Sequence, residues 1–323
     1  MKFRVSVPIF FVIITTSVIG QTCCSGGIPL SNNLGLEMLG KGTFQIGLNY
    51  DYNNLNTLKS GSTTLDDSSR LRITHTGLLN LGFSITNNLA IESLFTWVNQ
   101  RRKISQFGNE NLDQSSGVGD AILLVKYRFN NVFGKTSSLN FGVGAKLPLG
   151  SSTEKNNQGV TLNADLQPGS NTFDMIYWTM VSKNFDFRPS LTVSSRFIYR
   201  SAGTNNNYFG DSSYKFGNDF QTYLSFSDQF IISKKLVSPA ISFKYRNASK
   251  DKIEEFNLNN TGGNWVSIIP GFSVDINSKI AFLTKAEIPI YSNVDGTQLT
   301  PTFRLTSGIL IKITRKTRFL NLN

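Results

Sequence analysis

Apolar and polar residues alternate along most of this chain, most regularly in two runs that are separated by a short polar joint. In the first run, Leu123 and Val125 share one face, whereas Lys126 and Arg128 share the other. A second run of the same kind occupies residues 139–147. Because the side chains of a strand alternate between its two faces, each run predicts a strand with one apolar and one polar face. The short joint predicts an antiparallel hairpin.

The same alternation recurs along the chain and predicts twelve strands. They are expected at residues 43–52, 70–84, 89–100, 120–129, 139–147, 173–182, 187–200, 214–230, 237–246, 265–275, 280–291 and 301–314. Short turns alternate with long polar segments, and the long segments cover residues 53–69, 101–116, 151–171, 201–213, 247–263 and 293–300. This asymmetry is typical of outer-membrane barrels, which have short periplasmic turns and long external loops.

The predicted fold is therefore all-β: a transmembrane, antiparallel, up-and-down β-barrel of about twelve strands over residues 41–323, with its long loops outside. Alternation alone does not decide between lipid and water, because a soluble barrel also alternates, with its polar face outward. Aromatic residues near the strand ends, such as Tyr50, Trp97 and Tyr291, favour a membrane. The strands must then close, since lipid tolerates no open sheet edge.

Composition and charge agree with a membrane barrel and narrow the range of partners. Only 39% of the 323 residues are hydrophobic and 16% are charged, against about 45–50% and 25% in globular proteins. A barrel needs an apolar residue only at every second position. The formal charge of +11 is scattered over the chain without a long basic run, so we expect no nucleic-acid partner. The expected partners are outer-membrane lipid, the barrel-assembly machinery and a small-molecule solute.

The first forty residues carry export information. Lys2 and Arg4 precede an apolar stretch at residues 5–16 that is too short to span a bilayer. Together with small residues before Gln21, this pattern predicts a secretory signal peptide over residues 1–20, with an N-terminal anchor helix as the alternative. Residues 21–40 then form a periplasmic segment or a plug of the barrel. The predicted location is the bacterial outer membrane.

The two cysteines, Cys23 and Cys24, are neighbours in the sequence and cannot join distant strands. One interpretation is that these cysteines form a local or mixed disulfide. A lipid anchor is another, although Gln21 and Thr22 do not match the small and aliphatic residues that normally precede a lipidated cysteine. No further cysteine and no nearby histidine completes a metal site. We expect neither a metal nor a cofactor.

Several short motifs resemble those of a bacterial outer-membrane family. They are GD at residue 119, KYRF at residue 126, GAKLPLG at residue 144 and QPGS at residue 167. The family is named for the meta-pathway of phenol degradation, its members are usually called transporters, and it is loosely related to the fatty-acid outer-membrane channels. The resemblance implies a twelve-stranded barrel that admits small, often hydrophobic or aromatic, molecules. Asn-rich loops and Gln21 also resemble chains from the Bacteroidetes group of Gram-negative bacteria.

Charged residues of both signs fall on the face that the alternation turns inward. The candidate lumen-lining residues are Arg72, Glu92, Asp120, Lys126, Arg128, Lys146, Asp174, Arg196, Asp219, Lys244, Lys285, Glu287 and Arg304. Buried charges must pair, so we expect many of them to form salt bridges. In an open pore the surplus cations would favour anionic or polar solutes. For Lys126 and Lys146, two outcomes stay open: they set ion selectivity, or they are locked in pairs with Asp120 or Glu92.

His75 is the single histidine, so any catalysis that depends on histidine must use it. It falls on the apolar face of its predicted strand, where an outer-membrane phospholipase carries a catalytic pair. No convincing serine and asparagine partners are found, and we expect a packed or interfacial side chain and no enzyme. Three function classes remain: a transport channel, a structural or adhesive barrel without an open path, and a lipid-modifying enzyme. Conductance in a planar bilayer separates the first from the others.

Overall fold

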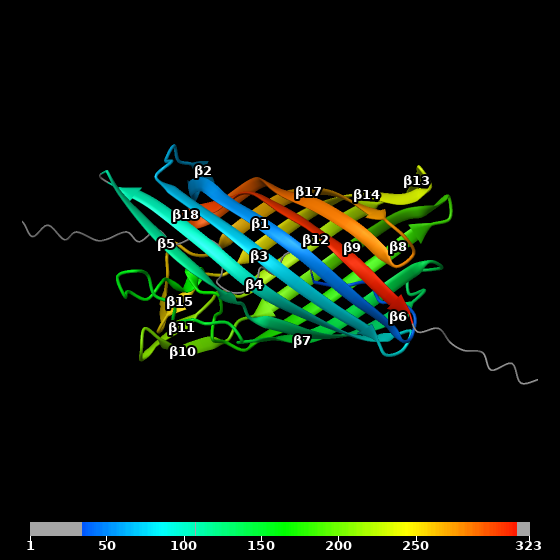
Figure 1. Cartoon of the computed structure of the whole chain (residues 1–323), viewed down its shortest axis with the longest axis horizontal. Helices are drawn as coiled ribbons and strands as arrows, with labels where there is room; N and C mark the ends of the chain where they lie inside the picture. The colour runs from blue at the N-terminus through cyan, green and yellow to red at the C-terminus, as the bar shows by residue number, and fades with distance from the viewer. Residues whose placement is uncertain (1–33, 107, 315–323) are drawn as a thin grey trace, which may run out of the picture.

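The computed structural model describes residues 34–106 and 108–314, which form a closed barrel of tilted strands (Figure 1). Its wall consists of β1 (Thr43–Gly61), β3 (Arg70–Ser84), β4 (Leu89–Gln106), β6 (Ala121–Asn130), β7 (Ser137–Leu147), β8 (Asp174–Phe185), β9 (Arg188–Ser201), β12 (Asp219–Ser227), β14 (Lys235–Ala248), β17 (Gly263–Asp275) and β18 (Ile280–Thr314). Neighbouring strands are antiparallel, and the pairing of β1 with β18 and of β12 with β14 closes the ring. The predicted signal peptide and Cys23–Cys24 lie outside the described residues.

Strand β18 is 35 residues long and fills two positions in the wall. Its residues 281–294 pair with β17, and its residues 294–314 pair with β1. The two halves also contact each other: Lys312 N donates to Lys279 O at 2.7 Å, and the hydroxyls of Thr284 and Ser307 are 2.7 Å apart. The eleven wall strands therefore fill twelve positions, which confirms the prediction of an antiparallel barrel of about twelve strands.

Shorter strands extend the wall or stand beside it. They are β2 (Thr63–Thr64), β5 (Asn109–Val118), β13 (Phe230–Ile232) and a separate sheet of β10 (Thr204–Tyr208), β11 (Ser212–Lys215), β15 (Lys252–Ile253) and β16 (Phe256–Asn257). Figure 1 shows β2, β5, β10, β11 and β15 at one end of the barrel, which we call the long-loop end. The opposite end carries the short turns. No described helix is long and apolar enough to cross a bilayer.

Three predicted loops proved to be strands, and one of them, residues 293–300, lies within the continuous strand β18. Residues 53–61 continue β1, and residues 101–106 and 109–116 form a hairpin of β4 with β5. The register of β1 shifts on both sides of Leu55, which turns Leu55 and Leu58 into a small buried cluster and breaks the alternation. In the β4–β5 hairpin most side chains are polar, so the apolar row that marks the other strands is missing there.

The strand predicted at residues 214–230 is also wrong in its extent. It is divided into β11, β12 and β13. The chain leaves the wall between β11 and β12, where Gly217 lies so close to Ser249 that an added Cβ would be 1.9 Å from the Ser249 carbonyl oxygen. Phe216, just before this point, is buried in the small cluster beneath the separate sheet. A continuous wall strand over residues 214–230 would allow neither the close approach of Gly217 to Ser249 nor the burial of Phe216.

The two faces of the wall differ in polarity, as β1 illustrates. Gln45 and Asp51 are buried on the inner side, whereas Leu48 and Tyr50 are each 52% exposed on the outer side. Large exposed hydrophobic side chains likewise occupy the outer rows of β6 and β7, including Val125. An apolar outer face around a polar interior is the arrangement of a barrel in lipid and the reverse of a soluble one.

Candidate functional site

The described part of the N-terminal segment, residues 34–42, lies inside the barrel. Leu34 is 1% exposed and belongs to an apolar cluster with inward-facing residues from many wall strands. The other members are Leu78, Leu94, Ile122, Leu124, Ile176, Trp178, Ile198, Tyr223 and Ile269. Gly35 has φ +102°, and a Cβ there would lie 2.7 Å from the Trp178 ring, so only glycine fits. The described residues of this segment therefore contact the inner wall, and the assignment of residues 21–40 to a plug or to a periplasmic segment stays a prediction.

Three predicted lumen residues hold this segment, and we call them the N-terminal clasp: Glu92, Lys126 and Arg196. The Glu92 carboxylate accepts hydrogen bonds from the backbone N–H groups of Gly35 and Leu36, both at 2.9 Å. Lys126 Nζ lies 2.7 Å from the same carboxylate and also donates to the Leu36 carbonyl. Arg196 donates to the Leu34 carbonyl at 3.1 Å and stacks on Tyr223.

A second group, which we call the loop clasp, consists of Asp120, Lys146 and Asp174. Lys146 Nζ lies 2.6 Å from Asp120 and 3.4 Å from Asp174. It also donates to the Thr172 carbonyl at 2.9 Å, and Asp120 accepts from the Ser170 N–H at 3.1 Å. The cluster therefore ties the loop after β7 to the inner wall through both side-chain and backbone groups.

The same loop is attached at a second point, through the short 3₁₀ helix η1 (Ala164–Leu166). Arg72, from β3, pairs with Asp165 at 3.0 Å, and both side chains are almost fully buried. Gln100, from β4, donates to the carbonyls of Leu166 and Gln167 at 3.1 and 3.2 Å. The prediction that residues 151–171 form an external loop needs correction, because this part of the loop folds back against the inner wall.

A third group of charges surrounds a small cavity of about 60 Å³ between β14, β17, β18 and β1. Three ion pairs belong to it: Lys244–Glu287 at 2.9 Å, Arg246–Asp219 at 2.7 Å and Arg304–Asp51 at 2.8 Å. The Trp265 ring completes one side, stacked on Arg246. A cavity of this size has room for a few water molecules but not for a larger solute.

Two predicted lumen residues remain, Arg128 and Lys285. Arg128 donates to Asn140 at 3.1 Å near the short-turn end. Lys285 lies on β18 opposite Gly271 of β17. The two residues are so close that a Cβ added to Gly271 would be 2.9 Å from the Cβ of Lys285. The thirteen predicted residues thus divide among separate clusters, and they do not form one ring. That they line a pore stays a prediction.

Sequence reasoning missed the polar groups that the clasps engage. These are the backbone of residues 34–36, the 3₁₀ helix with Asp165, and the side chains of Gln100 and Ser170. The one available signal was the QPGS motif at residue 167, whose Ser170 donates to Asp120 of the loop clasp. There Gly169 packs on Gly150 so closely that a Cβ on Gly169 would be 2.4 Å from the Gly150 carbonyl.

His75 lies on the outer face of the wall. Its Nδ1 is 2.6 Å from the hydroxyl of Tyr50, and its ring meets the ring of Tyr52 edge-on, with centroids 5.4 Å apart. Among residues 34–106 and 108–314, neither a serine nor a carboxylate contacts the imidazole. The arrangement is that of a packed interfacial histidine.

The closed antiparallel ring, its apolar outer face and its charged interior define a membrane-type β-barrel. Residues 51–291 match the family described as "Putative MetA-pathway of phenol degradation", and the chain belongs to this family. An outer membrane channel from Pseudomonas putida F1 has the same fold: the TM-score is 0.68 at 17% identity, covering 86% of this chain and 97% of that one.

Two further solved barrels align less well. The β domain of the Bordetella autotransporter BrkA gives a TM-score of 0.47 at 9% identity, covering 83% of this chain and 99% of that chain. The NanC porin gives 0.46 at 11% identity, with 84% and 100% covered. No curated protein matches the sequence. None of these matches supports the Bacteroidetes origin, which stays a prediction.

Proposed function

We propose that this protein is an outer-membrane channel for small, hydrophobic or aromatic solutes, and that the described conformation is its closed state. The P. putida barrel of the same fold is an outer membrane channel, and the family description refers to phenol degradation. Both names concern other proteins, and they supply only the expected class of solute. The physical support comes from the way in which the barrel is filled.

The observation that carries the proposal is that two chain segments, and not only wall side chains, fill the interior. A barrel of about eight strands is filled by its own side chains, whereas a wider one leaves space inside. Here residues 34–40 and 163–172 enter that space and are held by hydrogen bonds and ion pairs. Such contacts can be broken and remade, so a path can open without dismantling the wall.

The proposal includes a location and an orientation. The barrel stands in the outer membrane of a Gram-negative bacterium, delivered by its signal peptide and inserted by the barrel-assembly machinery. The long-loop end faces the cell exterior, because outer-membrane barrels keep their long connections outside. A cysteine introduced at Gly61 should react with an impermeant reagent on intact cells. Reaction only after the membrane is broken would reverse the orientation.

A second candidate is a structural or adhesive barrel that never opens. It is favoured by the apolar cluster around Leu34 and by the pairing of Lys126 and Lys146 with carboxylates, which leaves neither lysine free to attract an ion. The two candidates differ in conductance, and the N-terminal clasp supplies the decisive variant.

The test compares purified proteins in planar bilayers. In Glu92→Ala combined with Lys126→Ala, the Glu92–Lys126 ion pair is removed as a unit, so neither of its two charges is left without the other, and Arg196 stays in place. We expect the wild type to show low or intermittent conductance and the double variant to show a clearly larger one. The matched control is Lys103→Ala with Glu110→Ala, which removes an exposed ion pair of 2.6 Å outside the interior. Heat-modified gel mobility verifies folding. Folded proteins that never conduct would refute the channel.

A further inference from the structure

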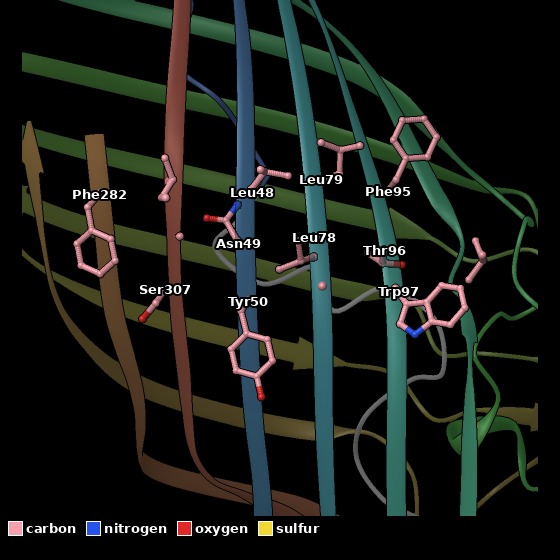
Figure 2. A pocket seen from close by; sticks show the side chains of 14 residues that line it. Leu48, Asn49, Tyr50, Leu78, Leu79, Phe95, Thr96, Trp97, Phe282 and Ser307 are labelled. Carbon is pink, nitrogen blue, oxygen red and sulfur yellow. The ribbon is translucent and has the colours of Figure 1, made fainter. Parts of the chain in front are cut away.

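The outer wall carries an apolar groove of about 740 Å³ across β1, β3, β4, β5 and β18. Figure 2 shows Leu48, Leu79 and Phe95 along one part of it and the rings of Tyr50 and Trp97 along another. Its floor is Gly77, which pairs with Tyr50 on one side and with Trp97 on the other. The other outer positions of β3 carry side chains. Gly77 has none, which leaves a gap between the rings of Tyr50 and Trp97.

The gap is not required by the backbone. Gly77 is absent from the described glycines with positive φ, and the nearest atom to a Cβ built on it is Trp97 Cβ, at 4.0 Å. A larger side chain would therefore fit, and the groove can be filled by substitution. The combination of Gly77 with the small Ser307 opens the groove between larger outer side chains and leaves space for a ligand.

The residues at the long-loop side of the groove change from apolar to polar in a definite order. The next outer position of β3 is His75, hydrogen-bonded to Tyr50. The outer row of β4 continues from Trp97 through Asn99 to Arg101. Arg101 is exposed, and no described residue forms a hydrogen bond or an ion pair with its guanidinium, whereas the next cation of the row, Lys103, pairs with Glu110.

This order corresponds to depth in a membrane. Tyrosine and tryptophan rings lie at the level of the lipid headgroups, which puts Tyr50 and Trp97 at the interface and the part of the groove at Leu48, Leu79 and Phe95 in hydrocarbon. Four residues separate Trp97 from Arg101, which is roughly 13 Å along a strand and roughly 10 Å along the membrane normal at the usual tilt. Arginine is the side chain best suited to phosphate, through paired charge-assisted hydrogen bonds.

We propose that the groove binds one molecule of lipopolysaccharide through its lipid A part, with an acyl chain over Gly77 and a phosphate on Arg101. The identity of the lipid rests on the proposed location, because lipopolysaccharide forms the outer leaflet that the long-loop end would face. The recognition itself rests on three features that follow one another along the membrane normal. They are the apolar groove, the rim of Tyr50 and Trp97, and the cation Arg101.

The test measures binding of diphosphoryl lipid A to the full-length barrel in a non-ionic detergent by native mass spectrometry. Gly77→Leu should fill the groove, and Arg101→Gln should remove the phosphate contact. Each is expected to weaken binding about tenfold, Arg101→Gln through loss of a charged hydrogen bond and Gly77→Leu through exclusion of the acyl chain. Removing one phosphate from lipid A should weaken binding to the wild type and leave Arg101→Gln unaffected.

Matched controls keep the result specific. Thr222→Leu adds a leucine to the outer row of β12, and Arg188→Gln removes a cation at the short-turn end, where it pairs with Asp228. Both should bind lipid A like the wild type. Unchanged binding in folded Gly77→Leu and Arg101→Gln would overturn the site. Equal binding of phosphatidylglycerol would overturn lipopolysaccharide as its ligand. If Gly77→Leu does not fold, the phosphate-removal experiment on Arg101→Gln decides alone.

Discussion

Strand β4 carries two ion pairs of the same chemistry in opposite surroundings. Glu92 pairs with Lys126 inside the barrel, where the side chains are 0% and 2% exposed. Lys103 pairs with Glu110 in the β4–β5 hairpin, where they are 42% and 52% exposed. The two N–O distances, 2.7 and 2.6 Å, are almost equal. Distance alone therefore does not indicate what either pair contributes.

The difference lies in what water does for each partner. In the exposed pair, water solvates a charge that loses its partner, and the pair is worth about 0–1 kcal/mol. In the buried pair, a lone charge would remain without solvent, so each partner is needed to keep the other. The Glu92 carboxylate also fixes the backbone of Gly35 and Leu36, which couples the electrostatics of the wall to the position of the N-terminal segment.

The largest expected effect comes from breaking the buried pair on one side only. Glu92→Ala leaves Lys126 buried without a carboxylate and should lower the free energy of unfolding by about 3–5 kcal/mol. Glu110→Ala should change it by less than about 1 kcal/mol. Urea unfolding in lipid vesicles, followed by tryptophan fluorescence, measures both. Similar losses in the two variants would mean that the interior is as well hydrated as the hairpin.

A cation placed on the outer face should be the next most costly change. Val143, on β7, is 52% exposed to the surrounding lipid in the proposed orientation. Val143→Arg should cost about 2–4 kcal/mol if it lies near the middle of the bilayer, and less toward either interface. Folding yield into vesicles, read from heat-modified gel mobility, tests it, with Val143→Leu as the control. Normal folding of the arginine variant would place β7 outside the membrane.

The strand pattern of the wall was predictable because period-two alternation is a local property. It places Leu48 outward and Asp51 inward, and the structure agrees. The extension of β1 was not predictable in this way. The shift of register at Leu55 reverses the faces, and the polar residues beyond it resemble a loop. Alternation identifies strands well only where one face is apolar and the other polar.

The candidate site was predictable in part for a related reason. Alternation assigns Glu92 and Lys126 to the inner face, and pairing of Lys126 and Lys146 with Asp120 or Glu92 was one of the two outcomes that the sequence left open. The contacts to the N-terminal segment and to η1 were not predicted, because they join groups that only the closed barrel brings together. Arg72 and Asp165, for example, are 93 residues apart in the sequence.

Loosening the loop should have a smaller effect than breaking the buried pair. Gln100→Ala removes two donated hydrogen bonds to the carbonyls of Leu166 and Gln167 and one accepted from the Arg72 guanidinium, which keeps its ion pair with Asp165. The expected loss is about 1–3 kcal/mol, mainly local, because the two carbonyls lose a buried partner. Hydrogen exchange of residues 163–172 should accelerate while exchange in the wall strands stays unchanged. Acceleration throughout the barrel would show that the loop is part of the global core.

The smallest expected effect concerns a buried carboxyl that has hydrogen bonds but no ion pair among the described residues. Asp251, beside the separate sheet, accepts from the Tyr214 hydroxyl at 2.6 Å and from the Gly217 N–H at 2.7 Å. Burial raises its pKa, and these hydrogen bonds offset only part of that effect.

A folded pKa above the unfolded one means that the stability contribution of Asp251 is complete below the unfolded pKa, near 3.9, and is lost as pH rises through the folded pKa. Protection of β11 and β15 from hydrogen exchange, corrected for intrinsic rates, should therefore decrease between pH 4 and pH 7, by about tenfold for each unit of pKa shift. In Asp251→Asn, which cannot ionise, that decrease should disappear, and a decrease of the same size in this variant would assign the pH dependence to another group.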